Sequence, residues 1–388
     1  MLPVKAFSVP PIVYGSGAAD HIGDELKKLG LKKGLIVTDK VMMGLPAFDS
    51  ITRALESSDI TVKVYDGVAT EPTCDYVNEG LDACRDDGVE FILAVGGGSS
   101  IDTAKAISIM LTNPGSVEDY MGAGKVEKAG IPLVAMPTTA GTGSEVTPYT
   151  IITDEKTNVK MLISSPRVIP RLAIVDPLLT LTCPPGLTAA VGIDALTHAI
   201  EAYVSVKAQP MSDMYCLAAI VLLNGYLKQA WEKGDDVEAR ERTMLGSLYA
   251  GIAFSNSSVA LVHGMSRPIG AYFHVAHGAS NAALLKQVME FSYPGNPARY
   301  AYLASLLGEN TQGKDEIEAS ALAVEAVGRL IKDIKIATLP ELGVTREKLE
   351  EMAPRMAEDA IASGSPANNP RPASKEEIIE LYMNAHNA

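Results

Sequence analysis

Short apolar runs recur along the first half of the chain, separated by stretches with a helical pattern, and this alternation limits the folds open to it. The runs occupy residues 12–14, 34–38, 60–65, 91–95, 133–136 and 172–175. Helical patterns lie between them, for example at residues 20–29 and 76–86. Runs that are apolar on both faces and alternate with helices are typical of βαβ units around a mostly parallel sheet. The first half is therefore predicted to be an α/β domain.

The second half has a different pattern. The last strands predicted in the first half form an antiparallel hairpin at residues 149–163. From about Pro185 onward the strand pattern disappears and long helical patterns follow. Ser374, with Glu377 three residues later, is a capping-box signature that predicts a last helix. We therefore expect an α/β domain at residues 1–184 and an all-helical domain at residues 185–388.

Composition excludes several classes of protein. The 388 residues carry a net charge of −14 without a run of Lys and Arg, which disfavours a nucleic-acid partner. The first residues lack the apolar segment of a signal peptide, and no apolar stretch is long enough to span a bilayer. The four cysteines are scattered without paired spacing, as expected for reduced thiols. We expect a soluble, cytoplasmic protein that binds neither nucleic acid nor a membrane.

A glycine-rich turn follows the apolar run at residues 91–95. Three glycines, Gly96 to Gly98, precede Ser99 and a helical pattern that contains Asp102. Glycines let the backbone approach a pyrophosphate, and the N–H groups at a helix start attract anions. The turn matches neither G-x-G-x-x-G nor the P-loop. We predict phosphate binding, with Ser99 able to cap the helix; the alternative is a simple strand-to-helix turn.

Two other positions complete the candidate nucleotide site. The Thr- and Gly-rich loop at residues 137–145 follows the next apolar run and could offer hydroxyls to a ligand, or be a plain flexible loop. Asp39 ends the run at residues 34–38, where a carboxylate can accept the ribose hydroxyls of NAD and repel a 2′-phosphate. An aspartate in this place can also be only a turn residue.

Three of the six histidines, together with one aspartate, suggest a metal centre. Asp194 and His198 are four residues apart in a helical pattern, which stacks a carboxylate and an imidazole on one face. His263 and His277 are each followed by glycine, which would permit a close turn around an ion. One carboxylate and three imidazoles suit iron(II) or zinc with a site left for substrate. Taken singly, each of these residues could instead be structural.

Together these segments resemble the iron-containing alcohol dehydrogenases, a family related to the glycerol dehydrogenases and dehydroquinate synthases. The resemblance runs nearly from end to end, and the run at residues 192–201 is its most specific part. The other similar segments are residues 7–17, 96–105, 137–147, 369–372 and 376–379. The fold implied is dehydroquinate synthase-like, with a dinucleotide-binding α/β domain and a helical metal-binding domain.

The resemblance also implies a set of site residues. The metal ligands would be Asp194, His198, His263 and His277. The cofactor-binding residues would be Asp39, Gly97, Gly98, Ser99, Asp102, Thr138, Thr139, Thr142 and Lys160. The implied cofactors are NAD and a divalent ion, iron(II) before zinc. The family implies a homodimer or larger homo-oligomer that acts on a small alcohol or aldehyde.

This chain departs from the family pattern near the centre. Arg267 stands where many relatives have a further histidine four residues after His263, and Lys286-Gln287 stands where Pro-His is frequent. A guanidinium does not deprotonate, so a proton would leave through ribose, water or His274. Arg267 is expected either to pair with a protein carboxylate or to bind a polar group of the substrate.

The predicted reaction is the interconversion of a primary alcohol or diol and its aldehyde. The ion would polarise the alcohol oxygen, and hydride would pass to the nicotinamide. One alternative is a lyase or cyclase of the dehydroquinate synthase type, which would need a basic, phosphate-binding substrate pocket. The other is a catalytically silent NAD-binding relative, against which the four retained ligands argue.

Overall fold

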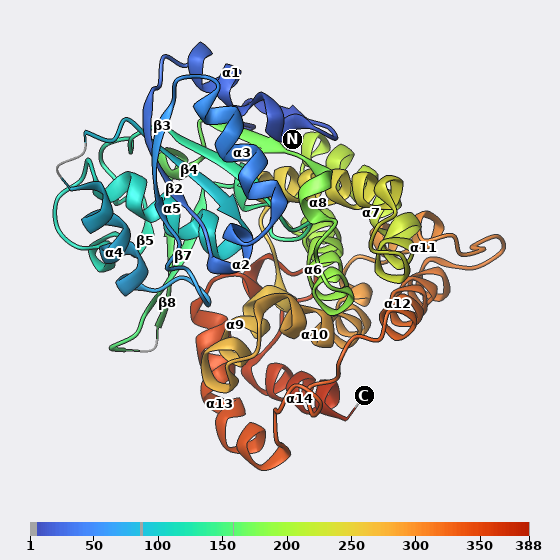
Figure 1. Cartoon of the computed structure of the whole chain (residues 1–388). Helices are drawn as coiled ribbons and strands as arrows, with labels where there is room; N and C mark the ends of the chain where they lie inside the picture. The colour runs from blue at the N-terminus through green and yellow to red at the C-terminus, as the bar shows by residue number, and fades with distance from the viewer. Residues whose placement is uncertain (1–5, 86–87, 158, 388) are drawn as a thin grey trace. The chain divides into compact units, whose positions relative to one another are not determined.

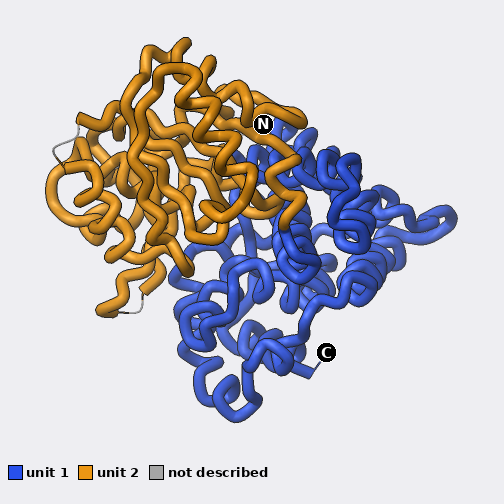
Figure 2. The backbone as a smooth tube through the Cα atoms, in the orientation of Figure 1, with its two compact units in different colours: residues 1–8, 183–388 blue, residues 9–182 orange. Residues whose placement is uncertain are grey.

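The computed structural model describes residues 6–85, 88–157 and 159–387. Asp86 of the predicted helix at residues 76–86, Asn158 of the predicted hairpin, and the first five residues lie outside this description. The chain forms two compact units (Figure 2): residues 9–182, and residues 183–388 together with the start of the chain. Each unit is described separately.

Six parallel strands form the main sheet of the unit at residues 9–182 (Figure 1). Their order across the sheet is β1 (Ile12–Tyr14), β9 (Leu172–Val175), β6 (Leu133–Pro137), β4 (Phe91–Gly96), β2 (Lys33–Val37) and β3 (Thr61–Tyr65). Every neighbouring pair is parallel. Each predicted apolar run forms one of these strands, which confirms the predicted α/β class.

The four inner strands of this sheet, β9, β6, β4 and β2, are buried on both faces, whereas the edge strands β1 and β3 are partly exposed. Successive residues of a strand point to opposite sides of the sheet. Leu35 and Val37 of β2 belong to one apolar core, with residues of α4 (Cys74–Cys84) and α5 (Gly98–Met110). Ile36 belongs to a second core, with residues of α1 (Ile22–Lys28) and α3 (Pro46–Glu56).

The helix predicted at residues 20–29 is divided: the 3-10 helix η1 (Ala18–His21) precedes α1. The remaining elements here are α2 (Lys40–Met43), η2 (Val117–Tyr120), η3 (Ser144–Val146), η4 (Pro166–Val168) and η5 (Pro177–Thr180).

A second, smaller sheet contains the predicted hairpin. β7 (Tyr149–Asp154) and β8 (Val159–Ser164) pair antiparallel in register from Tyr149 with Ser164. The two-residue strand β5 (Gly122–Ala123) adds to β8 in parallel. The hairpin is therefore confirmed, whereas β5 is too short for its sequence to reveal it.

The unit at residues 183–388 is built of helices, as predicted, and its described residues contain no strand. The helices are α6 (Pro185–Val204), α7 (Pro210–Glu232), α8 (Val237–Ser257), α9 (Leu261–Phe273), α10 (His277–Ser292), α11 (Pro297–Leu306), α12 (Glu316–Asp333), α13 (Arg346–Ala362) and α14 (Lys375–His386), with η6 (Tyr293–Gly295) and η7 (Pro366–Asn368) between them. Ser374 and Glu377 form the predicted capping box at the start of α14.

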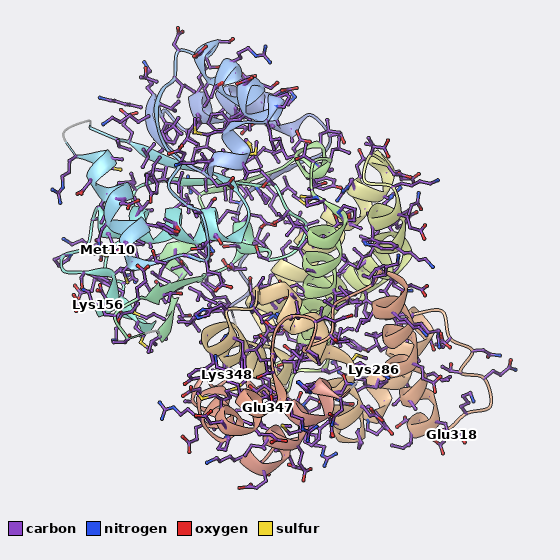
Figure 3. All side chains as sticks on the ribbon, turned by 60° about the horizontal axis from the view of Figure 1, so that its bottom comes forward. Met110, Lys156, Lys286, Glu318, Glu347 and Lys348 are labelled. Carbon is purple, nitrogen blue, oxygen red and sulfur yellow. The ribbon has the colours of Figure 1, made fainter. Side chains whose placement is uncertain are left out.

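Polar contacts join the ends of these helices. Lys348 of α13, labelled in Figure 3, donates to the carbonyl of Tyr272 and lies 4.8 Å from the ring centre of Phe273 at the end of α9. Ser8 exchanges two hydrogen bonds with the Asn256 side chain, which attaches the start of the chain to α8.

Within the described ranges, no single helix is long and apolar enough to cross a bilayer. The helices α8 and α9 meet that criterion only as a pair, and the pair is bent by 103°.

Candidate active site

The four predicted metal ligands come together on three helices. Asp194 and His198 lie one turn apart on α6, His263 is the third residue of α9, and His277 is the first residue of α10. The Asp194 Oδ1 atom is 3.6 Å from Nε2 of His263 and 4.0 Å from Nε2 of both other imidazoles. One possible ligand atom from each residue lies within 4.8 Å of all the others. These distances make the four side chains a single candidate metal centre.

The surroundings of the centre favour a cation. Asp194, His198 and His263 are buried, whereas 30% of the His277 side chain is exposed. Burial by itself raises the pKa of Asp194, but the nearby imidazoles outweigh burial and hold that pKa well below its usual range. Carboxylate and imidazole donors suit a divalent transition ion. The donor set therefore fits the implied iron or zinc.

Glu201 is a buried carboxylate of the centre that the sequence analysis did not single out. Its Oε2 atom is 2.6 Å from Nδ1 of His263, and its two oxygens accept the backbone N–H groups of Ala260 and Val262 at 2.9 and 2.5 Å. A carboxylate on Nδ1 favours the proton there and leaves the Nε2 lone pair directed toward Asp194. Burial lowers the pKa of His263, but the two nearby carboxylates, Glu201 and Asp194, outweigh burial and raise that pKa.

The position of Glu201 carries a sequence signal. It lies seven residues after Asp194 and three after His198, so all three share one face of α6. Another ligand, His198, is held by ring packing: its ring is stacked on that of Phe254, with 4.3 Å between the ring centres.

The glycines after His263 and His277 have a different purpose from the one predicted. Gly264 and Gly278 lie inside helices, so they do not form turns around an ion. A Cβ atom on Gly278 would lie 3.0 Å from the carbonyl oxygen of Ala190, and one on Gly264 would lie 2.6 Å from the ring of Pro366. The missing side chains therefore allow close packing, which brings the first turn of α10 against α6.

The residues that depart from the family pattern lie around the same helices. Arg267 is one turn after His263 on α9, and its Nη1 atom donates to Ser365 Oγ at 3.2 Å. His274 ends α9 in the left-handed conformation, with φ of 57°, and is exposed. Lys286, labelled in Figure 3, packs against Gly328 of α12, where a Cβ atom would lie 3.2 Å from the lysine chain. Catalytic roles for Arg267 and His274 stay predictions.

The other candidate site lies in the α/β unit, where β4 meets α5. Gly97 is the N-cap of α5 without a side-chain cap, so the prediction that Ser99 caps the helix was wrong. A Cβ atom on Gly98 would lie 2.8 Å from Thr142 Cγ2, and one on Gly97 would lie 3.5 Å from Thr139 Oγ1. The two predicted polar loops therefore contact each other beside uncapped N–H groups that can bind an anion. Thr138 adds a backbone hydrogen bond to the carbonyl of Gly96.

Asp102 and its neighbours hold the second loop in place. The carboxylate of Asp102 accepts hydrogen bonds from Ser144 Oγ at 2.5 Å and from the N–H of Ile151 at 2.9 Å. The fully buried Lys105 donates to Ser144, Thr147 and Tyr149 at 2.6–3.1 Å. Asp102 thus positions the loop at residues 137–147, and direct cofactor contact by this residue stays a prediction.

Asp39 and Lys160 have protein partners of their own. Asp39 Oδ1 caps the short helix α2 by accepting the N–H of Met42 at 2.8 Å, as the turn-residue alternative requires. Its Oδ2 atom lies 3.7 Å from where a Cβ atom of Gly96 would be, so the carboxylate also borders the glycine run. Lys160 on β8 forms an ion pair with Glu71. Both remain candidate cofactor residues.

Two models of one known protein family match the two halves of the chain. Residues 10–177 match the model for iron-containing alcohol dehydrogenases, and residues 188–386 match the C-terminal model of the same family. An NAD-dependent methanol dehydrogenase of Bacillus methanolicus is 38% identical, over 98% of this chain and 99% of its own. A 1,3-propanediol dehydrogenase of Citrobacter freundii is 40% identical, over 96% of each chain.

Solved structures agree with these matches. The crystal structure of a 1,3-propanediol oxidoreductase superposes with a TM-score of 0.96 at 38% identity, covering 99% of this chain and 100% of the other. The predicted likeness in fold therefore extends over nearly the whole chain.

Proposed function

Because this chain belongs to the iron-containing alcohol dehydrogenase family, we propose that it interconverts a small primary alcohol or diol and its aldehyde with NAD(H) and a divalent ion, iron(II) before zinc. The observation that carries the proposal is the cluster of Asp194, His198, His263 and His277. The names of the relatives support the substrate class, since they include methanol and 1,3-propanediol dehydrogenases. One of these names also specifies NAD.

The residues of the helical unit prepare the reacting alcohol. A divalent ion held by these ligands supplies a Lewis acid, which lowers the pKa of an alcohol hydroxyl. Glu201 keeps the Nε2 lone pair of His263 available by accepting a hydrogen bond from the Nδ1–H group. His277 is the ligand that solvent reaches, so a small alcohol approaches the centre past this side chain.

The residues of the α/β unit hold the hydride acceptor. The first-turn N–H groups of α5 bind the pyrophosphate, which approaches closely because Gly97 and Gly98 have no side chain. Asp39 accepts ribose hydroxyls and repels a 2′-phosphate, so NAD is preferred over NADP. NAD held by these residues would supply a hydride acceptor for the alcohol, whose hydroxyl proton would leave to solvent, and the reverse reaction would consume both.

The test is NADH formation by the purified protein on a panel of short alcohols, diols and hydroxy acids. Each substrate is assayed with NAD and with NADP, after metal removal by a chelator and after iron(II) or zinc is restored. We expect turnover that requires the ion and favours NAD. Full turnover without metal would refute the mechanism. Conversion without net NADH would indicate a dehydroquinate synthase-type reaction, and ligand binding without turnover would indicate a silent relative.

We also propose that the protein is a cytoplasmic homodimer or larger homo-oligomer. Two observations support this. Met211 and Met214 are 53% and 71% exposed, and their spacing of three residues puts them on one face of α7. Cys74 and Cys216 are buried free thiols, as is usual in a reducing compartment. Light scattering after size-exclusion chromatography measures the mass, and a monomer at micromolar concentration would exclude this assembly.

A further inference from the structure

Asn281 touches three of the four metal ligands. It is a fully buried residue of α10, one turn after His277. Its Nδ2 atom lies 2.6 Å from Asp194 Oδ1, 3.2 Å from His263 Nε2 and 3.1 Å from His277 Nε2. Its Oδ1 atom is buried and finds no hydrogen-bond partner among the described residues.

The contact with Asp194 fixes which way the amide points. A carboxylate accepts hydrogen bonds and cannot donate them, so an amide oxygen 2.6 Å away would be repelled. The nitrogen must therefore face Asp194, which leaves the oxygen of Asn281 on the unpartnered side. A buried acceptor without a donor is unfavourable for folding, so the orientation of this amide is set by the contact of its nitrogen with Asp194.

The amide nitrogen and a metal ion would use the same lone pairs. Glu201 favours the proton on Nδ1 of His263, so Nε2 of that ring is an acceptor, and the amide of Asn281 can donate to it. An ion on the imidazoles needs those Nε2 lone pairs, whereas the hydrogen bond to Asp194 can persist beside it. The two N–H groups of the amide thus donate to the carboxylate and to the imidazole side when the ligands hold no ion, and the amide orients the carboxylate when they do.

We propose that Asn281 is a positioning residue of the metal centre, which keeps Asp194 and the imidazoles arranged for the ion. This inference rests on the proposed function, since it concerns the same centre. It assigns no ligand bond to Asn281. The role is carried by an N–H donor, so it is lost in a side chain of similar size that has no N–H group.

The first test measures metal affinity and not turnover. Cobalt(II) is titrated into metal-free wild type, Asn281→Ala and the control Ser280→Ala, in competition with a coloured chelator, and the visible spectrum of bound cobalt is recorded. Ser280 is the adjacent buried residue of α10, and its hydroxyl bonds to backbone carbonyls. We expect Asn281→Ala to weaken affinity about 10–100-fold and alter the spectrum, with Ser280→Ala close to wild type. Wild-type affinity and spectrum in Asn281→Ala would overturn the inference.

The second test uses Asn281→Leu, which nearly keeps the size of the side chain. This variant has no N–H donor for Asp194, so its rise in melting temperature on cobalt binding should be smaller than that of wild type. An equal rise in melting temperature in both proteins would contradict the proposal. This second test remains informative if Asn281→Ala does not fold. Failure of wild type itself to bind a divalent ion would instead refute the proposed function.

Discussion

The two candidate sites are built from different parts of the chain. In the helical unit the metal centre consists of side-chain atoms from α6, α9 and α10. In the α/β unit the phosphate cradle consists mainly of backbone N–H groups, at a helix start where Gly97 and Gly98 leave space. A side-chain site fails when one side chain is removed, whereas a backbone site fails when a side chain is added. The following substitutions test this contrast.

Removal of one ligand should have the largest effect. His263→Ala deletes the imidazole nearest to Asp194 and should abolish metal retention. Loss of a Lewis acid forfeits several kcal/mol of transition-state stabilisation, which is on the order of 10³-fold or more in kcat/KM. Activity and metal content are measured together, with circular dichroism to check the fold. His386→Ala on α14 is the matched control, and a fully active His263→Ala would disprove the assigned centre.

A smaller effect is expected one step away from the ion. Glu201→Gln preserves the shape of the side chain but removes the charge that faces Nδ1 of His263. Metal affinity should fall about 10–100-fold, as is usual when the partner of a metal-binding histidine is changed. Competition titration with a chelator measures the change, and the exposed Glu325→Gln serves as control. If affinity is unchanged, Glu201 has only a folding role.

Addition of a methyl group tests the backbone site. In Gly98→Ala the new Cβ would lie 2.8 Å from Thr142 Cγ2, so the loop at residues 137–147 must shift. The dissociation constant of NADH should rise about tenfold, which corresponds to about 1.4 kcal/mol, while metal content stays normal. Fluorescence titration gives the constant. Gly225→Ala on α7 is the control, since its Cβ would meet no atom within 4 Å; equal NADH affinity in all three proteins would contradict the cradle.

The smallest effect concerns the pH dependence of stability in the α/β unit. Burial raises the pKa of Glu145 from 4.5 to about 7. Between these values the folded state holds a proton that the unfolded state releases, so stability falls as pH rises through this window. Glu145→Gln should flatten that decline in a series of melting curves between about pH 5 and 8. The exposed Glu155→Gln should leave the wild-type slope, and an equal slope in Glu145→Gln would show that Glu145 does not titrate there.

Sequence patterns predicted elements better than contacts. The parallel strands were visible because residues such as Leu35, Ile36 and Val37 are all apolar, as burial on both faces requires. The four ligands were visible because few residue types bind iron or zinc. Glu201 and Asn281 share helix faces with the ligands at spacings of seven and four residues, but amides and carboxylates are too common on helices for spacing alone to identify them.

Close packing between distant segments was the least predictable feature. Gly264 and Gly278 suggested turns, because nothing in their own neighbourhood indicates that Pro366 and Ala190 pack against them. Ser99 suggested a helix cap because serine is a common N-cap residue. The structure places the N-cap two residues earlier, at Gly97, directly after the end of β4. Local propensity gives way to tertiary contacts at each of these positions.

The unequal exposure of the four ligands determines how the centre exchanges its ion. Water reaches His277, with 30% of its side chain exposed, whereas the other three ligand side chains are at most 6% exposed. A multidentate site releases an ion one bond at a time, so we expect both release and uptake to begin at His277, in the first turn of α10. Such exchange would need only local opening and not unfolding. The folded chain would then be loaded from its surroundings, and the relative abundance of iron and zinc there would help to decide which ion it carries.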